Sequence, residues 1–345
     1  IDRIRRESRR DAKHQAALMI SPENQAEAGN HEPVGVVEDD RLRLIFTCCH
    51  PALAPEARVA LTLRLLGGLS VAEIAQAFLV PETTMAQRIT RAKRKIKHAK
   101  VPYRVPEAED LTPRLAAVLA VVYLVFNEGY LASSGEESVR EDLSGEAIRL
   151  GRTLRVLLPD EPEVAGLLAL MLLTESRRES RVAGGELVPL RDQDRGGWDR
   201  ALIAEGHDLV RECLARGRPG QYQLLAAVNA VHTDAPDAAA TDWEQIATLY
   251  SQLHTVAPTP IVALNRAVAV AELDGPEVAL AEVDRLGEGQ PGLRTYHAWH
   301  ATRADLLRRL GRSAEARAAY DAAIDATENP AERVYLSRRR GTLAP

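Results

Sequence analysis

The stretch from Leu69 to Lys100 constrains the fold of this 345-residue chain more than any other, because it predicts two short helices joined by a tight turn. Ser70 and Glu73 have the spacing of a capping box, in which each side chain accepts a hydrogen bond from a backbone amide at a helix start. We therefore expect one helix from Val71 and, after a short turn, a second helix with Pro81 at its first position. The stretch predicts a helix-turn-helix.

The second helix of this stretch has two chemically different faces. An apolar face repeats at helical spacing and is expected to pack inward; it consists of Met85, Ile89, Ala92 and Ile96. The opposite face carries side chains that suit DNA, namely Thr83, Thr84, Gln87, Arg88, Arg91 and Arg94. Gln can bond adenine and Arg can bond guanine with two hydrogen bonds, while hydroxyl groups suit phosphates or bases. The pattern predicts DNA binding.

Positive charge extends past this helix. Eight basic residues and no acidic residue occur between Arg88 and Arg104. Because the whole chain has a net charge of −5, the remainder carries a net charge of −13. Most charged runs are solvated helix faces with no function, but a capped helix-turn-helix with apolar and polar faces in register favours a polyanionic partner.

Two stretches of the sequence suggest other chemistry. Cys48, Cys49 and His50 could hold zinc, but adjacent cysteines do not easily face one ion and no second ligand pair accompanies them, so core packing is favoured. An enzyme could use Glu175 with Glu179, or a polar cluster made of Asp192, Asp194, Arg195, Trp198 and Asp199. The carboxylates have arginine neighbours for salt bridges, and neither a nucleophile motif nor a phosphate loop accompanies them. We expect no catalysis, no metal and no cofactor.

The rest of the chain reads as helix after helix, which predicts an all-α fold with a four-helix DNA-binding domain and a tetratricopeptide-like array. Residues 1–20 are a helix tail, 21–40 an acidic linker, 41–100 the helix-turn-helix domain, 101–113 a second linker, 114–217 a helical extension and 218–345 the repeats. The repeat assignment depends on one pattern of small and large residues that occurs twice. Its members are Ala304, Leu307, Gly311, Ala316, Tyr320 and Ala323, preceded by Ala267, Val270, Asp274, Ala279, Val283 and Leu286.

Location can be judged from cysteines and apolar runs. Three cysteines give no disulfide framework, which favours a reducing compartment. The longest apolar run, Leu115 to Phe126, is shorter than the roughly 20 residues that span a bilayer. The sequence predicts a cytoplasmic protein without membrane association. Because the chain starts with Ile1 in a charged helical pattern, we also expect it to be a fragment.

Leu69 to Lys97, with EIA and VPETTMAQRITRAKRK, resembles region 4 of bacterial extracytoplasmic-function sigma factors, which reads the promoter −35 element. The opening IDRIRRES resembles the end of region 2 of the same family, most of which is then missing. YLVFNEGY, LMLLTESRR and RDQDRGGWD resemble the subgroup with a tetratricopeptide-like C-terminal extension. The resemblance implies a non-enzymatic sigma factor that binds core RNA polymerase and promoter DNA, with a small YCII-related protein as a further partner.

Carried onto this chain, the resemblance places the second helix in the −35 major groove. The residues expected to contact bases or phosphates are Pro81, Glu82, Thr83, Thr84, Gln87, Arg88 and Arg91. Those expected to hold phosphate or polymerase are Lys93, Arg94, Lys95 and Lys97. The chief alternative is a transcriptional activator that combines a helix-turn-helix with a repeat-type interaction domain and is not a polymerase subunit.

Overall fold

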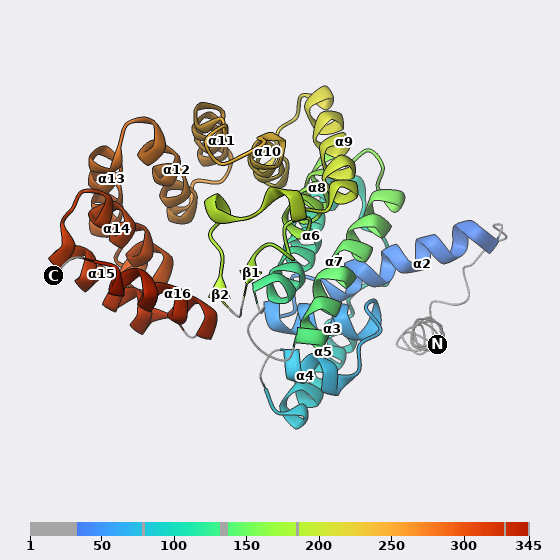
Figure 1. The fold of residues 1–345 in the computed structure, drawn as a ribbon. Helices are drawn as coiled ribbons and strands as arrows, with labels where there is room; N and C mark the ends of the chain where they lie inside the picture. Colours follow the sequence, from blue (N-terminus) through green and yellow to red (C-terminus); the bar gives the residue numbers. More distant parts are fainter. Residues whose placement is uncertain (1–32, 78–79, 132–136, 184–185, 328, 344–345) are drawn as a thin grey trace. The chain divides into compact units, whose positions relative to one another are not determined.

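A computed structural model of the chain describes residues 33–77, 80–131, 137–183, 186–327 and 329–343, and these residues are almost entirely helical (Figure 1). This confirms the predicted all-α class. Among them, the strands form one antiparallel pair, β1 (Val182–Ala183) and β2 (Glu186–Leu187), in which Val182 lies opposite Leu187. The chain divides into two compact units, one made of 1–131 with 136–164 and the other of 132–135 with 165–345.

The first unit contains the helix-turn-helix and the helices that pack against it. Its helices are α2 (Pro33–Cys48), α3 (Pro55–Leu65), α4 (Val71–Ala77), α5 (Glu82–His98), α6 (Ala108–Leu131) and α7 (Glu137–Leu157). α4 and α5 both pack against α3, while α6 and α7 pack on each other and on α2. The core of this unit is built from apolar side chains of all these elements, including Phe46, Leu61, Leu63, Ile74, Met85, Val125, Phe126 and Leu154.

Two predicted boundaries differ from the structure in this unit. α2 begins at Pro33, so the last part of the segment expected to be an acidic linker is helical. α6 begins at Ala108, within the segment expected to be the second linker. α6 also packs against α2 and α3, and α7 packs against α2 and α4, so these two helices belong to the same compact unit as the helix-turn-helix.

The second unit is a series of helices that pack mainly on their neighbours in the chain. α8 (Pro162–Glu175) begins at the unit boundary and is buried from Val164 to Leu173. The following elements are η2 (Leu190–Asp192), η3 (Arg195–Gly197), α9 (Arg200–Arg216), α10 (Gln221–Asp234), α11 (Trp243–Val256), α12 (Pro260–Leu273), α13 (Pro276–Gly289), η4 (Pro291–Thr295), α14 (His297–Arg309), α15 (Ser313–Ala326) and α16 (Pro330–Gly341).

The residues of the repeated pattern form the core of the last helices. Ala267 and Ala279 are fully buried where α12 packs on α13, and Ala304 and Ala316 are fully buried where α14 packs on α15. These small side chains lie in the contacts of each pair, as close helix approach requires. The turns between the helices use Gly275 and Gly311 at φ values of 90° and 73°, which only glycine adopts without strain. None of the described helices combines the length and apolar character needed to cross a bilayer.

Candidate nucleic-acid interface

The start of the helix-turn-helix is fixed by the predicted capping box. The Ser70 amide donates to Glu73 Oε2 at 2.6 Å, and the Glu73 amide donates to Ser70 Oγ at 3.1 Å. α4 accordingly begins at Val71, and its Ile74 and Ala75 are buried. Arg64 holds the preceding turn by donating from Nη1 to the Leu69 carbonyl at 3.0 Å. The capping prediction is therefore confirmed.

The second helix, α5, buries the four apolar residues that the sequence singled out, Met85, Ile89, Ala92 and Ile96. Its first residue is one position later than expected. Pro81 has a ψ of 141°, outside the helical range, and its carbonyl accepts the first helical hydrogen bond from the Met85 amide at 3.1 Å. Pro81 is thus the N-cap and Glu82 the first helical residue, and the expectation of proline at the first position was wrong by one residue.

The structure places the predicted DNA-contacting residues on the outward side of α5 and its N-terminus. Most are exposed, namely Pro81, Glu82, Thr83, Gln87, Arg91, Arg94, Lys95 and Lys97. The remaining three, Thr84, Arg88 and Lys93, are partly buried. Within the part of the chain that the structure describes, the six arginines and lysines of α5 have no carboxylate partner. Their charges are available to an external polyanion.

The direction of α5 suits its charges. The single acidic residue of the helix, Glu82, lies in the first turn, and Lys95, Lys97 and His98 lie in the last turn. Both placements agree with the helix dipole, which favours negative charge at the N-terminus and positive charge at the C-terminus. Past the helix, Arg104 is paired with Glu107 at 2.8 Å. The positive charges that lack a carboxylate partner among the described residues are therefore mainly those of α5.

Helix α7 holds the turn that precedes the helix-turn-helix, a contact that the sequence did not predict. Arg149 on α7 donates from Nη2 to the Leu66 carbonyl at the end of α3, at 3.0 Å, and is itself paired with the buried Glu146 at 2.6 Å. Gly67 lies under this pair. A Cβ added there would lie 2.8 Å from the Leu63 carbonyl oxygen and 3.2 Å from Glu146 Cγ. The orientation of α4 relative to α3 therefore depends on α7.

A second long-range contact fastens α6 to the same unit. Arg114, in α6, donates from Nη2 to the Phe46 carbonyl near the end of α2, at 3.0 Å. Tyr103, between α5 and α6, donates from its hydroxyl to the Asp40 carbonyl at 3.1 Å. In each of these contacts the acceptor is a backbone carbonyl, which has no sequence signature, so periodicity and motif spacing could not have revealed them.

The two cysteines considered as metal ligands lie in the core of the first unit. Cys48 and Cys49 are buried free thiols, and Cys49 Sγ lies 3.6 Å from Thr62 Oγ1. Burial raises the pKa of Cys49 to about 11, despite the opposing hydrogen bond to Thr62, so the thiol stays protonated. His50 Nδ1 accepts from the Ala52 amide at 3.1 Å. No group of three His, Cys, Asp or Glu side chains among the described residues could hold a metal ion.

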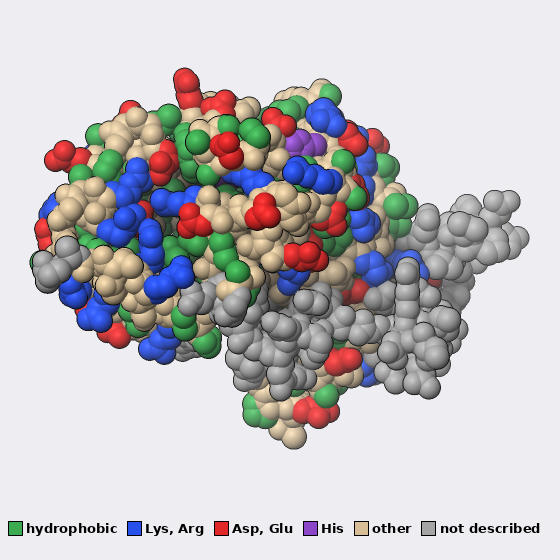
Figure 2. All heavy atoms as spheres, viewed as in Figure 1, with side chains coloured by type: hydrophobic (Ala, Val, Ile, Leu, Met, Phe, Trp, Pro, Cys, Tyr) green, Lys and Arg blue, Asp and Glu red, His purple; other side chains and the backbone are tan. Residues whose placement is uncertain are grey.

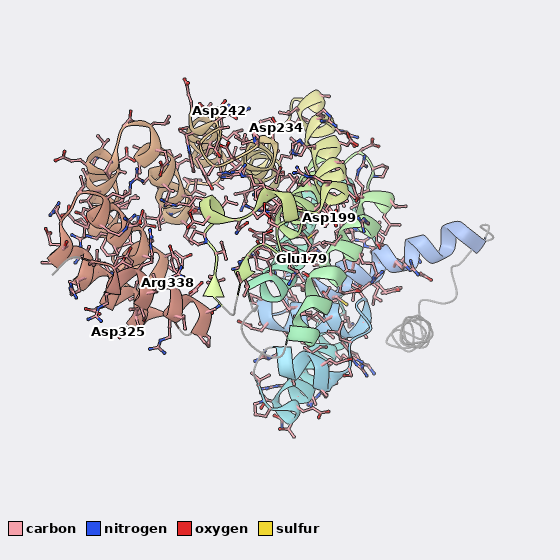
Figure 3. The ribbon with its side chains drawn as sticks, in the orientation of Figure 1. Glu179, Asp199, Asp234, Asp242, Asp325 and Arg338 are labelled. Carbon is pink, nitrogen blue, oxygen red and sulfur yellow. The ribbon has the colours of Figure 1, made fainter. Side chains whose placement is uncertain are left out.

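The acidic residues considered for catalysis have local structural partners. Glu175 pairs with Arg178 at 2.6 Å at the end of α8, as expected for a salt bridge, and Glu179 (labelled in Figure 3) lies beyond the last helical residue rather than on the same helical face. Asp199, also labelled in Figure 3, caps α9 by accepting from the Ala201 amide at 2.8 Å. Asp194 likewise accepts from the Gly196 amide at 2.8 Å. These carboxylates stabilise turns and helix starts.

Arg195, in the same cluster, is buried and links its own loop to the end of α10. Its Nη1 donates to the His232 and Ala235 carbonyls at 2.6 and 2.5 Å, and its guanidinium carbon lies 4.9 Å from the centre of the Trp198 ring. The guanidinium thus satisfies the carbonyls at the end of α10, as a structural arginine does. The side chains of this cluster therefore hold neighbouring turns and helix ends together.

A helix-turn-helix whose second helix carries basic side chains without a carboxylate partner among the described residues is the arrangement of a DNA-binding domain, and sequence comparison matches this part of the chain to sigma-70 region 4. Residues 43–96 match the family described as Sigma-70, region 4, and residues 114–214 match a family of unknown function, DUF6596. Uncharacterized protein R00370 of Rhizobium meliloti (strain 1021) is 46% identical over 346 residues, which cover 100% of this chain and 81% of that protein. The chain belongs to the same family as this rhizobial protein.

Proposed function

We propose that this chain is a sigma factor of the extracytoplasmic-function type, which directs core RNA polymerase to promoters. α5 reads the −35 element in the major groove, and the C-terminal helices, which we take to be tetratricopeptide-like, regulate activity. The observation that carries the proposal is the exposed basic face of α5, which has no carboxylate partner among the described residues, within a segment matching sigma-70 region 4.

The residues of α5 divide into two roles in this proposal. Thr83, Gln87 and Arg91 are exposed and lie one helical turn apart along the face that enters the groove, so we assign them to base edges together with Arg88. The lysines and arginine nearer the C-terminus, Lys93, Arg94, Lys95 and Lys97, hold phosphates or polymerase. Base contacts would give sequence preference, whereas phosphate contacts would give affinity that falls with salt.

The test has two stages that separate DNA reading from polymerase binding. First, the chain is incubated with a randomised duplex library, and bound sequences are selected over several rounds; one enriched motif is expected. Second, the chain and the longer rhizobial relative are each mixed with bacterial core RNA polymerase, and co-elution and run-off transcription from the enriched motif are measured. Transcripts from the relative together with co-elution of both proteins would support the proposal.

Other results would point elsewhere. Selection of a motif without any binding of polymerase by either protein would favour the separate activator. Failure to enrich any sequence would overturn the assignment of α5 as a reading helix. The small YCII-related partner stays a prediction, which a pull-down with that purified protein can check.

A further inference from the structure

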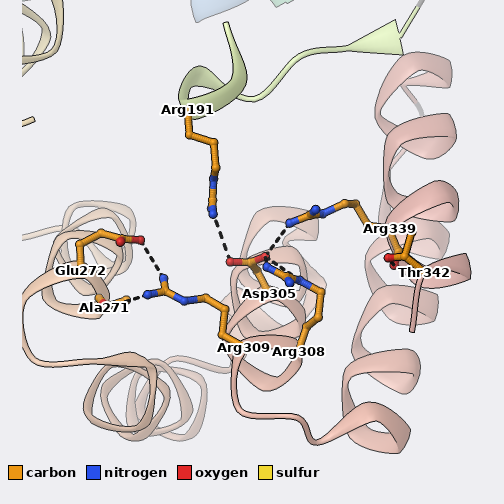
Figure 4. Close-up of polar contacts among 8 residues, drawn as sticks. All are labelled: Arg191, Ala271, Glu272, Asp305, Arg308, Arg309, Arg339 and Thr342. Atoms are coloured by element: carbon orange, nitrogen blue, oxygen red, sulfur yellow. Dashed lines mark hydrogen bonds and ion pairs between the residues drawn. The ribbon is translucent and has the colours of Figure 1, made fainter. Parts of the chain in front are cut away.

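One carboxylate in the second unit is surrounded by three arginines from three elements (Figure 4). Asp305, on α14, accepts on Oδ1 from Arg308 Nη2 at 2.7 Å and from Arg339 Nη2, on α16, at 3.2 Å. Its Oδ2 lies 3.6 Å from Nη2 of Arg191, on η2. Arg308 is three positions from Asp305 on the same helix, whereas Arg191 and Arg339 are distant in the sequence and meet Asp305 because η2 and α16 both reach it.

Asp305 does not satisfy all of these donors. Each guanidinium carries five N–H groups, whereas the carboxylate offers two oxygens. The contact to Arg191 is longer than a hydrogen bond, and the side chain of Arg191 is 52% exposed. Nε of Arg339 is buried and has no acceptor among the described residues. Arg191 on η2 and Arg339 on α16 therefore each have N–H groups near Asp305 that lack an acceptor among the described residues.

A fourth arginine extends the positive surface. Arg309, on α14, donates from Nη1 to Glu272 on α12 at 2.7 Å and from Nη2 to the Ala271 carbonyl at 3.0 Å. We call Arg191, Arg308, Arg309 and Arg339 the arginine cluster. With Asp305 and Glu272 as its two carboxylates, the cluster has a net charge of +2. Figure 2 shows Lys and Arg side chains gathered over the repeat helices on the face in view.

Asp305 is the carboxylate at the centre of the cluster. Burial opposes ionisation of Asp305, but its hydrogen bond and charge interaction with Arg308, together with the charges of Arg191 and Arg339, lower its pKa. The carboxylate is therefore ionised and already counted in the net charge. An added anion would meet an excess of positive charge in a partly buried setting, where solvent screening is weaker than at an open surface.

We propose that the arginine cluster binds carboxylates of an acidic segment of a partner protein. Arginine forks match carboxylates with paired hydrogen bonds, and the half-exposed Arg191 has donors left for such a group, while Arg339 adds positive charge beside it. A nucleic acid is disfavoured because Asp305 and Glu272, with Asp192 beside Arg191, interrupt the positive surface and would repel a continuous row of phosphates. This inference rests on the proposed regulatory role of the C-terminal helices and gives that role a ligand chemistry.

The test uses the full chain and a defined probe. A twelve-residue peptide of alternating Glu and Ala, with blocked ends and a fluorescein label, is titrated with wild type, Arg191→Glu and Arg285→Glu, and anisotropy is measured at low and moderate salt. Arg285 is an exposed arginine on α13 that donates to the Ala281 carbonyl and has no carboxylate partner among the described residues, so its variant matches the charge change and corrects for binding of the peptide to α5. Arg191→Glu is expected to weaken binding about tenfold relative to Arg285→Glu.

Folding and specificity are checked separately. Arg191 makes one weak contact, so its variant is expected to unfold at the wild-type urea concentration, and Arg339→Gln is the second variant expected to weaken the peptide. Equal peptide affinity of Arg191→Glu and Arg285→Glu would overturn the proposal. If a twelve-nucleotide single strand, rather than the peptide, loses affinity in Arg191→Glu, the cluster is a nucleic-acid site and the proposal is wrong. No promoter DNA or polymerase is present, so neither result affects the sigma-factor proposal.

Discussion

At the scale of single residues, the side chains of α5 differ in what their removal should do. Arg88 is partly buried and lies one turn from the partly buried Thr84 and the exposed Arg91. If Arg88 reads a guanine, Arg88→Ala should weaken the enriched DNA motif by about 1–3 kcal/mol and relax the preference at one base position. Competition titrations with single-base variants of the motif measure both effects.

A phosphate-binding residue provides the matched comparison. Lys97→Ala removes an exposed charge near the C-terminus of α5, and we expect it to weaken all duplexes evenly and to reduce the salt dependence by about one ion. Equal loss for every duplex with Arg88→Ala would show that Arg88 holds phosphate. Unchanged DNA binding by both variants would contradict the placement of α5 in the groove.

His232 makes the stability of the second unit depend on pH. Burial, followed by the charges of Arg177 and Arg195, lowers the pKa of His232 to about 4. An unfolded chain has a histidine pKa near 6.5. Between about pH 6.5 and pH 4 the unfolded state binds a proton that the folded state does not, so stability should fall as the pH falls through this range. His232→Asn should reduce this loss, measured as the difference in urea midpoint between pH 7 and pH 4.5.

His254 offers the control for this effect. It lies exposed near the end of α11, and its replacement by asparagine shows how much of any change comes from replacing a histidine at an exposed position. If His232→Asn and His254→Asn show the same slope as wild type, the buried histidine does not contribute, and carboxylates such as Asp305 account for the acid sensitivity.

At the scale of elements, the capping box controls how well α4 forms. The reciprocal bonds between Ser70 and Glu73 satisfy two amides at the first turn of a helix of only seven residues. Ser70→Ala should cost about 1 kcal/mol of unfolding free energy, measured with urea. Ser251→Ala, which removes a hydroxyl bonded to the Ala247 carbonyl inside α11, is the control with little expected change. A loss of the same size in both variants would show that the cap has no special weight.

The helix-turn-helix could be predicted from sequence because its signals are local. The capping pair, the apolar repeat of α5 and the run of positive charge all lie within about thirty residues, and periodicity reads such patterns well. Pro81 was misplaced by one position because proline fits both an N-cap and a first helical position. The strands β1 and β2 were missed because two residues each are too few for an alternating pattern.

The packing of α6 and α7 against the helix-turn-helix could not be predicted from the same signals. Arg149 lies 83 positions from the carbonyl that it bonds, and Arg114 lies 68 positions from its acceptor. An arginine that caps a distant backbone group looks like any surface arginine in a helical pattern. Prolines and acidic residues after Val101 therefore suggested a linker, although the helices on both sides share one core.

At the scale of the whole molecule, the DNA-binding part should be larger than the segment that matches region 4. The sequence signals of the helix-turn-helix are local, and taken alone they predict that a chain without residues 111–345 keeps the helix-turn-helix folded. Because α6 and α7 cover α2, α3 and α4, we now expect a chain ending at Arg104 to expose apolar surface and unfold at lower urea concentration than a chain ending at Val164. Circular dichroism and anisotropy with the enriched motif measure folding and DNA binding of both chains.

The weaker DNA binding of the shorter chain should come from the lost contact between α7 and the turn after α3, and not from chain length alone. In the full chain, Arg149→Ala removes the bond to the Leu66 carbonyl and the ion pair with the buried Glu146 at 2.6 Å, so DNA binding should weaken while α12–α16 stay folded. Hydrogen exchange resolved by peptide separates these regions. If the chain ending at Arg104 unfolds at the same urea concentration as the chain ending at Val164, α6 and α7 are dispensable for the stability of the helix-turn-helix.

The close packing at Gly67 affects whether the two matched segments can be exchanged between proteins. Gly67 belongs to the stretch that matches sigma-70 region 4, whereas Glu146, whose Cγ would lie 3.2 Å from a Cβ added at that glycine, belongs to the stretch that matches DUF6596. In a chimera that joins residues 114–214 to a helix-turn-helix with a larger residue at position 67, the new Cβ would lie 2.8 Å from the Leu63 carbonyl oxygen and 3.2 Å from Glu146 Cγ, so the turn after α3 would have to shift. A change at this one position therefore alters the packing of both matched segments.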